Sequence, residues 1–186
     1  MNHSEIIETT RRWISSIVIG LNLCPFAQRV FDAERIRYVV SDATDEAGLA
    51  ASLTSELTLL AETPLETTET TLLIHPHVFG DFLDYNDFLE VADDLIARLD
   101  LDGVIQVASF HPAYQFSETE PDAVENYTNR SPYPMLHLLR EESISAIAED
   151  EARLLAIPER NIAMLRALGL SAMLQKLAEI KGSASG

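Results

Sequence analysis

The sequence predicts one α/β domain built on a small, mostly parallel β-sheet of three or more strands, with crossover helices and two C-terminal helices. Short runs rich in β-branched and aromatic residues alternate with longer segments whose apolar residues recur every three or four positions. Strands joined by helices of about a dozen residues usually run parallel. The 186 residues suffice for one hydrophobic core. We expect the domain to span residues 1–181 and the tail 182–186 to be disordered.

The first elements follow from apolar spacing and from one proline. Apolar residues continue with helical spacing from Ile6 to Leu21, which predicts a first helix. Pro25 disfavours helical geometry at the preceding residue, so the helix should end near residues 20–23 and leave Cys24 just beyond it. Residues 36–40 then predict a strand, and residues 45–61 a helix with leucines on one face.

The remaining elements continue this alternation. Residues 70–74 predict a second strand, followed by a third helix that buries residues between 88 and 99. Residues 104–110 are nearly all apolar, which is typical of a strand covered on both faces, so we expect this strand at the centre of the sheet. Beyond a proline-rich loop, residues 135–148 and 158–180 have helical patterns, with a bend at Gly169.

Charge and cysteine content limit the functional classes. Thirty acidic against 13 basic side chains give a formal charge of −17, which repels the phosphates of nucleic acids and of anionic lipids. A single cysteine excludes an intramolecular disulfide and suits a reducing compartment. The N-terminal residues lack the apolar run of a signal peptide. We therefore expect a cytoplasmic protein that binds neither nucleic acid nor membrane; the oligomeric state is left open.

Candidate site residues gather after two predicted strands. His75 and His111 each follow a strand directly, and ligands of open α/β sheets bind at the carboxyl ends of the strands. His111 also opens a long polar loop, and loops of this length in compact domains are often functional. Asn129 and Arg130 precede a predicted helix, an arrangement that favours a bound anion. We expect substrate binding by residues that include His75 and this loop: Tyr114, Asn129, Arg130 and Arg140.

Catalytic groups are expected at His111, Cys24 and His137. On a helix, His137 would share a face with Arg140 and Glu141, so a salt-bridge ladder is an alternative interpretation. Cys24 could be a nucleophile if a neighbouring cation lowered its pKa, but buried, inert cysteines are common. A metal site using His75, His111 and His137 is a further alternative, although no recognised zinc spacing is present.

Several phrases of the sequence resemble one known family. GLNLCPFA, TTLLIHP, YNDFL, QVASFHPAYQF and ENYTNRSPYPMLHLLRE are similar to a bacterial family of conserved proteins known only as a domain of unknown function. The likeness covers roughly residues 13–168. It implies a small cytosolic bacterial protein and carries over no catalytic residue, cofactor or substrate. CPFAQR also resembles the redox turn of glutathione transferases related to glutaredoxin, where a strand precedes the cysteine instead of the helix predicted here.

Three functional hypotheses follow from these residues. The first is an enzyme acting on a small anionic or carbonyl-containing metabolite, with His111 as acid or base, Asn129 and Arg130 orienting the substrate, and Cys24 as an optional nucleophile. The second is a binding or scaffold protein whose loop aromatics contact a partner. The third is a metalloprotein. The enzyme hypothesis expects His111 and Arg130 to share a pocket with Cys24, His75 or His137.

Overall fold

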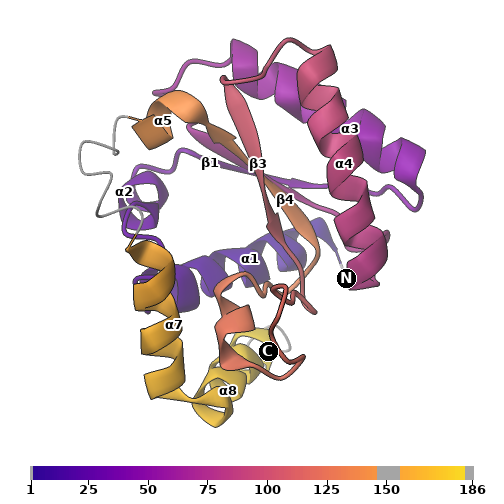
Figure 1. Ribbon diagram of the computed structural model, residues 1–186. Helices are drawn as coiled ribbons and strands as arrows, with labels where there is room; N and C mark the ends of the chain where they lie inside the picture. Colours follow the sequence, from indigo (N-terminus) through magenta and orange to yellow (C-terminus); the bar gives the residue numbers. More distant parts are fainter. Residues whose placement is uncertain (1, 146–155, 183–186) are drawn as a thin grey trace.

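The computed structural model describes residues 2–145 and 156–182 (Figure 1). Its four-stranded sheet has the order β1 (Ile36–Val40), β2 (Thr70–Ile74), β4 (Met135–Arg140) and β3 (Ile105–Phe110). β1 and β2 are parallel, whereas β4 runs antiparallel to both β2 and β3. The α/β class is confirmed. The expectation of a mostly parallel sheet was wrong, because β4 separates two parallel strands.

The segment that forms β4 explains this error. Residues 135–140 were predicted to be helical, but they form a strand with apolar side chains on both faces of the sheet. A short, continuous apolar run fits a buried strand as well as a helix, so its periodicity does not separate the two. β4 also displaces β3 from the expected central position to an edge. A helix, α5 (Glu141–Ser145), follows immediately, and residues 146–148 of the predicted helix lie outside the described residues.

The helices between the strands agree with prediction. Helix α3 (Glu46–Glu62) connects β1 to β2, and helix α4 (Phe82–Arg98) connects β2 to β3. Asp45 caps the first of these and Asp81 the second, each through a side chain that accepts a backbone N–H. Such caps satisfy donors that the first turn of a helix leaves unpaired.

The N-terminal helix has an unusual second half. Helix α1 (His3–Trp13) begins at a capping box formed by Asn2 and Glu5 and continues into a π-helix, η1 (Ile14–Ile19). The helical stretch ends at Gly20, as expected, and the short helix α2 (Ala27–Asp32) follows the turn that contains Cys24. Between residues 2 and 23 the chain forms no strand before Cys24, so the strand that the glutathione transferase resemblance implies is absent there.

The described residues of the C-terminal part add three further helical elements. A 3₁₀ helix, η2 (Val124–Thr128), lies within the predicted loop. Helices α7 (Ile157–Leu168) and α8 (Leu170–Gly182) are separated at Gly169, whose φ of 82° suits glycine and accounts for the predicted bend. Residues 183–186 of the expected disordered tail lie outside the described part of the chain. None of the described helices combines the length and apolar character needed to cross a lipid bilayer.

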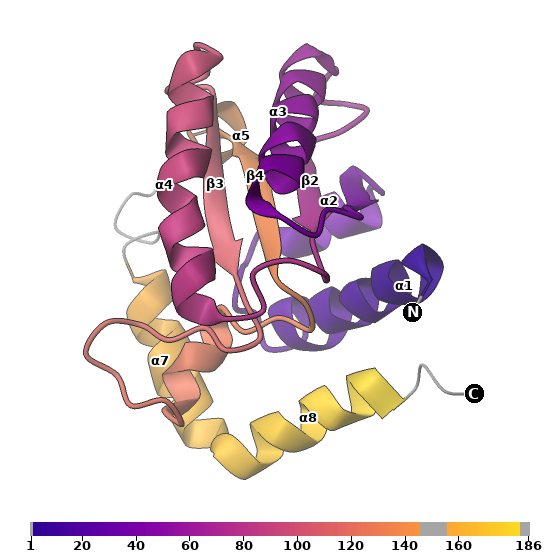
Figure 2. The ribbon, with the colours of Figure 1, turned by 90° about the vertical axis from the view of Figure 1, so that its right-hand side faces the viewer.

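The sheet separates two hydrophobic clusters because successive strand residues point to opposite faces. Helices α3 and α4 lie side by side over one face (Figure 2), where they pack against Leu73, Leu136 and Leu138. Helix α1, η1, α7 and α8 belong to the cluster on the other face, with Leu72 and Met135. Figure 1 shows α1 and α2 on the opposite side of the sheet from α3 and α4. The candidate site lies on this second face.

Candidate functional site: a pocket on the sheet face

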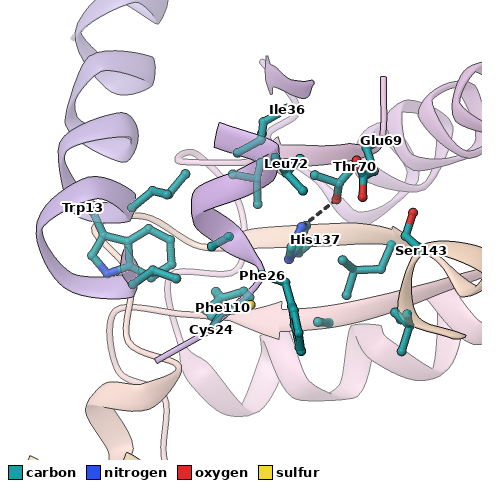
Figure 3. Close-up of a pocket in the computed structure, with 17 residues that line it drawn as sticks. Trp13, Cys24, Phe26, Ile36, Glu69, Thr70, Leu72, Phe110, His137 and Ser143 are labelled. Atoms are coloured by element: carbon teal, nitrogen blue, oxygen red, sulfur yellow. Dashed lines mark hydrogen bonds between the residues drawn. The ribbon is translucent and has the colours of Figure 1, made fainter. Parts of the chain in front are cut away.

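A pocket of about 300 Å³ lies between the sheet and the N-terminal helical segment (Figure 3). Its walls are mostly apolar, and the polar side chains among them are few. The sheet contributes Ile36, Thr70, Leu72, Ala108, Phe110, His137 and Leu139. The helical side and the two ends contribute Trp13, Ile14, Val18, Cys24, Phe26, Ala27, Val30, Glu69, Ser143 and Ile144. Cys24 and His137, two residues that the sequence indicated as catalytic, are therefore brought together in one pocket.

The floor of the pocket is the centre of the sheet. His137 lies on the inner strand β4, between Leu72 of β2 and Ala108 of β3 in the strand register. Side chains directly opposite one another on neighbouring strands are close, so the small methyl group of Ala108 leaves space beside the imidazole. Phe110, two residues further along β3, packs its ring edge-on against Trp13 at a centroid distance of 5.5 Å. This aromatic pair closes one end of the pocket.

The π-helix η1 forms much of the opposite wall. Ile14 and Val18 line the pocket from this widened turn, and Gly20 ends it by donating its N–H to Ser15 at 3.0 Å. A side chain at position 20 would collide with the carbonyl oxygen of Ser16. π-Helical turns are rare and frequently accompany functional sites. The local backbone therefore needs glycine here to present the pocket wall.

The turn that holds Cys24 is fixed by helix α7. The buried amide of Asn161 donates to the carbonyl of Leu23 at 2.8 Å, and Arg160 donates to the carbonyl of Asn22. Asn22 has a φ of 52°, a left-handed conformation that asparagine tolerates. The thiol of Cys24 is exposed at the edge of the pocket. A residue distant in sequence thus positions the loop on which the thiol lies.

Hydrogen bonds determine the proton position on His137. The hydroxyl of Thr70 donates its single proton to the carbonyl of Leu138 at 2.6 Å, so its oxygen accepts a proton from Nε2 of His137, also at 2.6 Å. Burial lowers the pKa of His137 to about 4. The ring is therefore neutral at pH 7, with its proton on Nε2 and a lone pair on Nδ1. No hydrogen bond reaches Nδ1 from any described residue.

One end of the pocket carries a charged cluster. The Glu69 side chain, 4% exposed, accepts hydrogen bonds from Arg29 and lies 3.5 Å from Arg35. Two guanidinium groups thus face one carboxylate, and the Nε of Arg35 is buried without a partner. Among the three side chains, only Glu69 lines the pocket. The cluster fixes the end of the pocket next to Thr70.

His75 and His111 meet at the carboxyl ends of β2 and β3, outside this pocket. Both rings contact Tyr85 of α4, at centroid distances of 5.7 and 5.1 Å, although β4 lies between the two strands. His111 accepts from the backbone N–H of Ala113 through Nδ1 and donates from Nε2 to the carbonyl of Phe79. Burial lowers the pKa of His111. Both ring nitrogens of His111 are thus engaged in holding the adjoining turns.

His75 is fully buried, and its environment is apolar. Its Nδ1 lies 3.2 Å from the carbonyl of Val78, while Nε2 is buried without a partner. Burial lowers the pKa of His75 to about 4, with a smaller contribution from nearby His111. The two histidines therefore bind successive carbonyls of the turn at residues 78–79, where Phe79 has a φ of 55°. Such a conformation is unusual for a bulky residue.

The loop residues expected to bind substrate are occupied by internal contacts. Asn129 donates to the carbonyl of Ser109 at 3.1 Å. Arg130 donates to the carbonyls of Tyr114 and Pro121, and its guanidinium lies 4.5 Å above the ring of Tyr127. Tyr114 packs against Phe82 and Phe116. Since β4 follows this loop, the expected helix N-terminus behind Asn129 and Arg130 does not exist, and neither residue lines the pocket.

Arg140 and His137 do not share a face, contrary to the helical prediction. In a strand, residues three apart point to opposite sides of the sheet. Arg140 is buried and donates to the carbonyls of Leu60, Thr63 and Thr68, at and beyond the C-terminal end of α3. The expected ladder with His137 is therefore absent. Arg140 instead satisfies carbonyls that the helix end leaves unpaired.

The described residues give little support to the metal and scaffold hypotheses. Within residues 2–145 and 156–182, no three His, Cys, Asp or Glu side chains are grouped so that they could hold a metal ion. His137 lies in the pocket, whereas His75 and His111 lie at the strand ends. The large apolar side chains exposed in the same ranges are aliphatic: Leu59, Leu83, Val104 and Leu174. The loop aromatics are instead partly or fully buried.

Sequence reasoning missed most of the pocket wall. Thr70 and Glu69 were not singled out, because a threonine or glutamate at a strand start has no local signature. One signal did exist: in MLHLLR a single histidine interrupts a run of apolar residues. A polar ring in a buried strand needs a hydrogen-bond partner or a ligand. This pattern would have indicated His137 within a strand.

Comparison with known proteins places the chain in a family. No curated protein and no solved structure matches it significantly. One family model, described as "Protein of unknown function (DUF1415)", matches residues 5–175. The match includes the pocket, the Cys24 turn and the β4 strand. It confirms the resemblance found in the sequence, and the chain belongs to the DUF1415 family.

Proposed function

We propose that this protein is an enzyme that takes a small, mainly apolar, carbonyl-containing molecule into the sheet pocket, where Cys24 and His137 meet it. The observation that carries the proposal is a single cavity of about 300 Å³ that contains both residues. Pockets for small molecules typically measure about 300–1,000 Å³, are mostly apolar and contain a few polar groups. A cavity of about 150 Å³ accommodates benzene, so this pocket suits a molecule only somewhat larger.

The apolar walls of the pocket favour a neutral carbonyl compound over the small anionic metabolite, the other substrate that the sequence suggested. Transferring an ion from water to apolar surroundings costs much more free energy than transferring a neutral carbonyl. The arginines at the polar end are already paired with Glu69, and neither lines the pocket. The expected anion-binding residues, Asn129 and Arg130, lie elsewhere and bind backbone carbonyls. A neutral carbonyl compound is therefore the favoured substrate.

Cys24 supplies the nucleophile in this proposal. Its sulfur would add to the carbonyl carbon, forming a C–S bond as the C=O π bond breaks, and the thiol proton would pass to the carbonyl oxygen. This step gives a hemithioacetal or hemithioketal and consumes no other reactant. His137 is a weak base because of its low pKa, so its role is to accept a hydrogen bond and orient the substrate.

A screen with four proteins tests the proposal. Neutral apolar aldehydes and ketones would be incubated with the wild type, Cys24→Ser, Ala108→Leu and Ala97→Leu, and both binding and formation of the Cys24 adduct followed by NMR. Ala108 faces the pocket beside His137, whereas Ala97 is exposed on α4. We expect up to one equivalent of hemithioacetal or hemithioketal with the wild type and Ala97→Leu, a loss of about 100-fold or more in adduct formation in Cys24→Ser, and no binding to Ala108→Leu. Absence of binding by every compound, or full adduct formation in Ala108→Leu, would overturn the proposal.

Binding without chemistry is a second candidate, supported by the low pKa of His137, which provides no strong base next to Cys24. In that case a compound bound by the wild type is recovered unchanged, and Cys24→Ser binds it with the same affinity. The two candidates thus differ in whether a covalent Cys24 adduct forms, and they share the pocket.

A further inference from the structure

The polar end of the pocket has a definite hydrogen-bonding polarity. Thr70 has no proton to offer, because its hydroxyl donates to the carbonyl of Leu138. His137 has none either, because its single proton is on Nε2 and is donated to Thr70. In the view of Figure 3, the imidazole lies with Thr70 on one side and Phe26 and Phe110 on the other. The ring therefore presents a lone pair to the pocket and no N–H.

This lone pair has no partner among residues 2–145 and 156–182. No described residue bonds to Nδ1 of His137. Unlike Nε2 of His75, this nitrogen is not sealed off in the interior. Since His137 lines the pocket, Nδ1 opens on it. The neighbouring carboxylate of Glu69 is likewise an acceptor. A ligand group that is itself only an acceptor would find two acceptors here, whereas a donor would satisfy one of them.

We propose that the ligand of this pocket carries a neutral hydrogen-bond donor, such as a hydroxyl, at the end that lies against Nδ1 of His137. The inference rests on the proposed function and specifies its substrate class. The substrate has an apolar body and a hydrogen-bond donor at the end that lies against Thr70 and His137. Its carbonyl group would then lie toward Cys24. An ammonium donor is disfavoured by the apolar walls and by the two arginines at Glu69. A carboxylate is disfavoured by both acceptors.

A series of matched probes tests this donor rule. Toluene, benzyl alcohol, benzaldehyde and benzoate share one ring and differ at one position, and their affinities for the wild-type protein would be measured by NMR titration. We expect toluene to bind and benzyl alcohol to bind roughly five- to tenfold more tightly, since one hydrogen bond made inside an apolar site raises the affinity by about this amount. In Cys24→Ser, where no hemithioacetal forms, benzaldehyde should gain nothing over toluene, and benzoate should bind least.

Two variants on one strand provide the control. Thr70→Val removes the acceptor of the Nε2 proton, so the imidazole proton is free to move to Nδ1. Benzyl alcohol and toluene should then bind with about equal affinity. Thr71→Val makes the same change at the next residue, whose buried hydroxyl has no partner and lies on the other face of the sheet. This control should keep the wild-type preference. In the wild type, ¹⁵N NMR should find the His137 proton on Nε2.

The outcomes separate the two proposals. If toluene binds but benzyl alcohol binds no better, or if benzoate binds best, or if benzaldehyde binds best to Cys24→Ser, the donor rule is wrong while the pocket proposal stands. A proton found on Nδ1 of His137 likewise overturns the donor rule alone. If none of the four probes binds, the proposed function fails, and the donor rule fails with it.

Discussion

At the scale of single residues, the buried histidines link stability to pH. His75 is fully buried, and its pKa falls from 6.5 to about 4 because burial disfavours the charged ring. The pKa of His137 falls in the same direction. Between pH 6.5 and 4 the unfolded chain therefore binds protons that the folded chain does not. Histidine contributions to stability are complete above pH 6.5 and are lost as the pH falls toward 4.

We predict that the free energy of unfolding decreases by up to about 3 kcal/mol per buried histidine from pH 6.5 to pH 4, the amount that follows from such a shift in pKa. In His75→Asn, the loss of unfolding free energy between pH 6.5 and pH 4 should be smaller by the contribution of one buried histidine. His77→Asn, at an exposed position, should show the same loss as the wild type. Urea denaturation at several pH values measures both. Since the three proteins share all other titratable groups, equal slopes in His75→Asn and the wild type would contradict the prediction.

The structure brings together some of the candidate site residues that the sequence indicated and separates others. Cys24 and His137 were singled out from the sequence and lie in one pocket, but the reasoning for His137 relied on a helix that does not exist. His75 and His111 each follow a strand, as the sequence indicated, and both rings contact Tyr85 although β4 lies between the two strands. The Thr70–His137 hydrogen bond could not be foreseen, because it joins two strands whose pairing depends on the whole sheet.

At the scale of elements, local sequence signals predicted most helices and strands. Helices α3 and α4 and strands β1 to β3 have clear periodicity, capping residues or β-branched runs. Strand β4 was missed because its apolar residues face both sides of the sheet, which removes the alternation that identifies a strand. The π-helix was also missed, since its wider turn has no distinct apolar period over six residues. Both elements line the pocket.

We predict that Gly20→Ala lowers the free energy of unfolding by about 2 kcal/mol, because the new methyl group meets the carbonyl of Ser16 and must shift the end of the π-helix. The shift should also change the rate at which a thiol reagent modifies Cys24. Gly80→Ala is the matched control, since a methyl group there has no neighbour within 4 Å. Thermal unfolding and timed labelling of Cys24 measure the two effects. Similar behaviour of the two variants would show that the turn does not need glycine.

At the scale of the whole molecule, β4 joins the two halves of the sheet. It pairs with β2 along one edge and with β3 along the other, whereas β1 and β3 each pair on one side only. Helices α3 and α4 cover one face, and the pocket with the N-terminal and C-terminal helices covers the other. Opening β4 therefore requires the loss of both pairings and of packing on both faces.

We predict that the backbone amides of residues 136–139 exchange with solvent more slowly than those of β1, by about 100-fold or more, because only near-global unfolding exposes them. Hydrogen exchange followed by two-dimensional NMR measures this directly. Residues 37–39 of β1, on an edge strand, provide the internal comparison. Exchange of β4 at the rate of β1 would contradict the strand order.

The position of β4 also has a consequence for folding during synthesis. Strands β1, β2 and β3 leave the ribosome before β4, yet β3 has no strand partner until residues 135–140 arrive to separate it from β2. The nascent chain therefore holds an unpaired strand and an open pocket floor while the loop of residues 111–134 is being made. Since His137 lies on β4, the pocket is completed only together with the sheet. The ligand proposed above could consequently bind only after this last strand has paired.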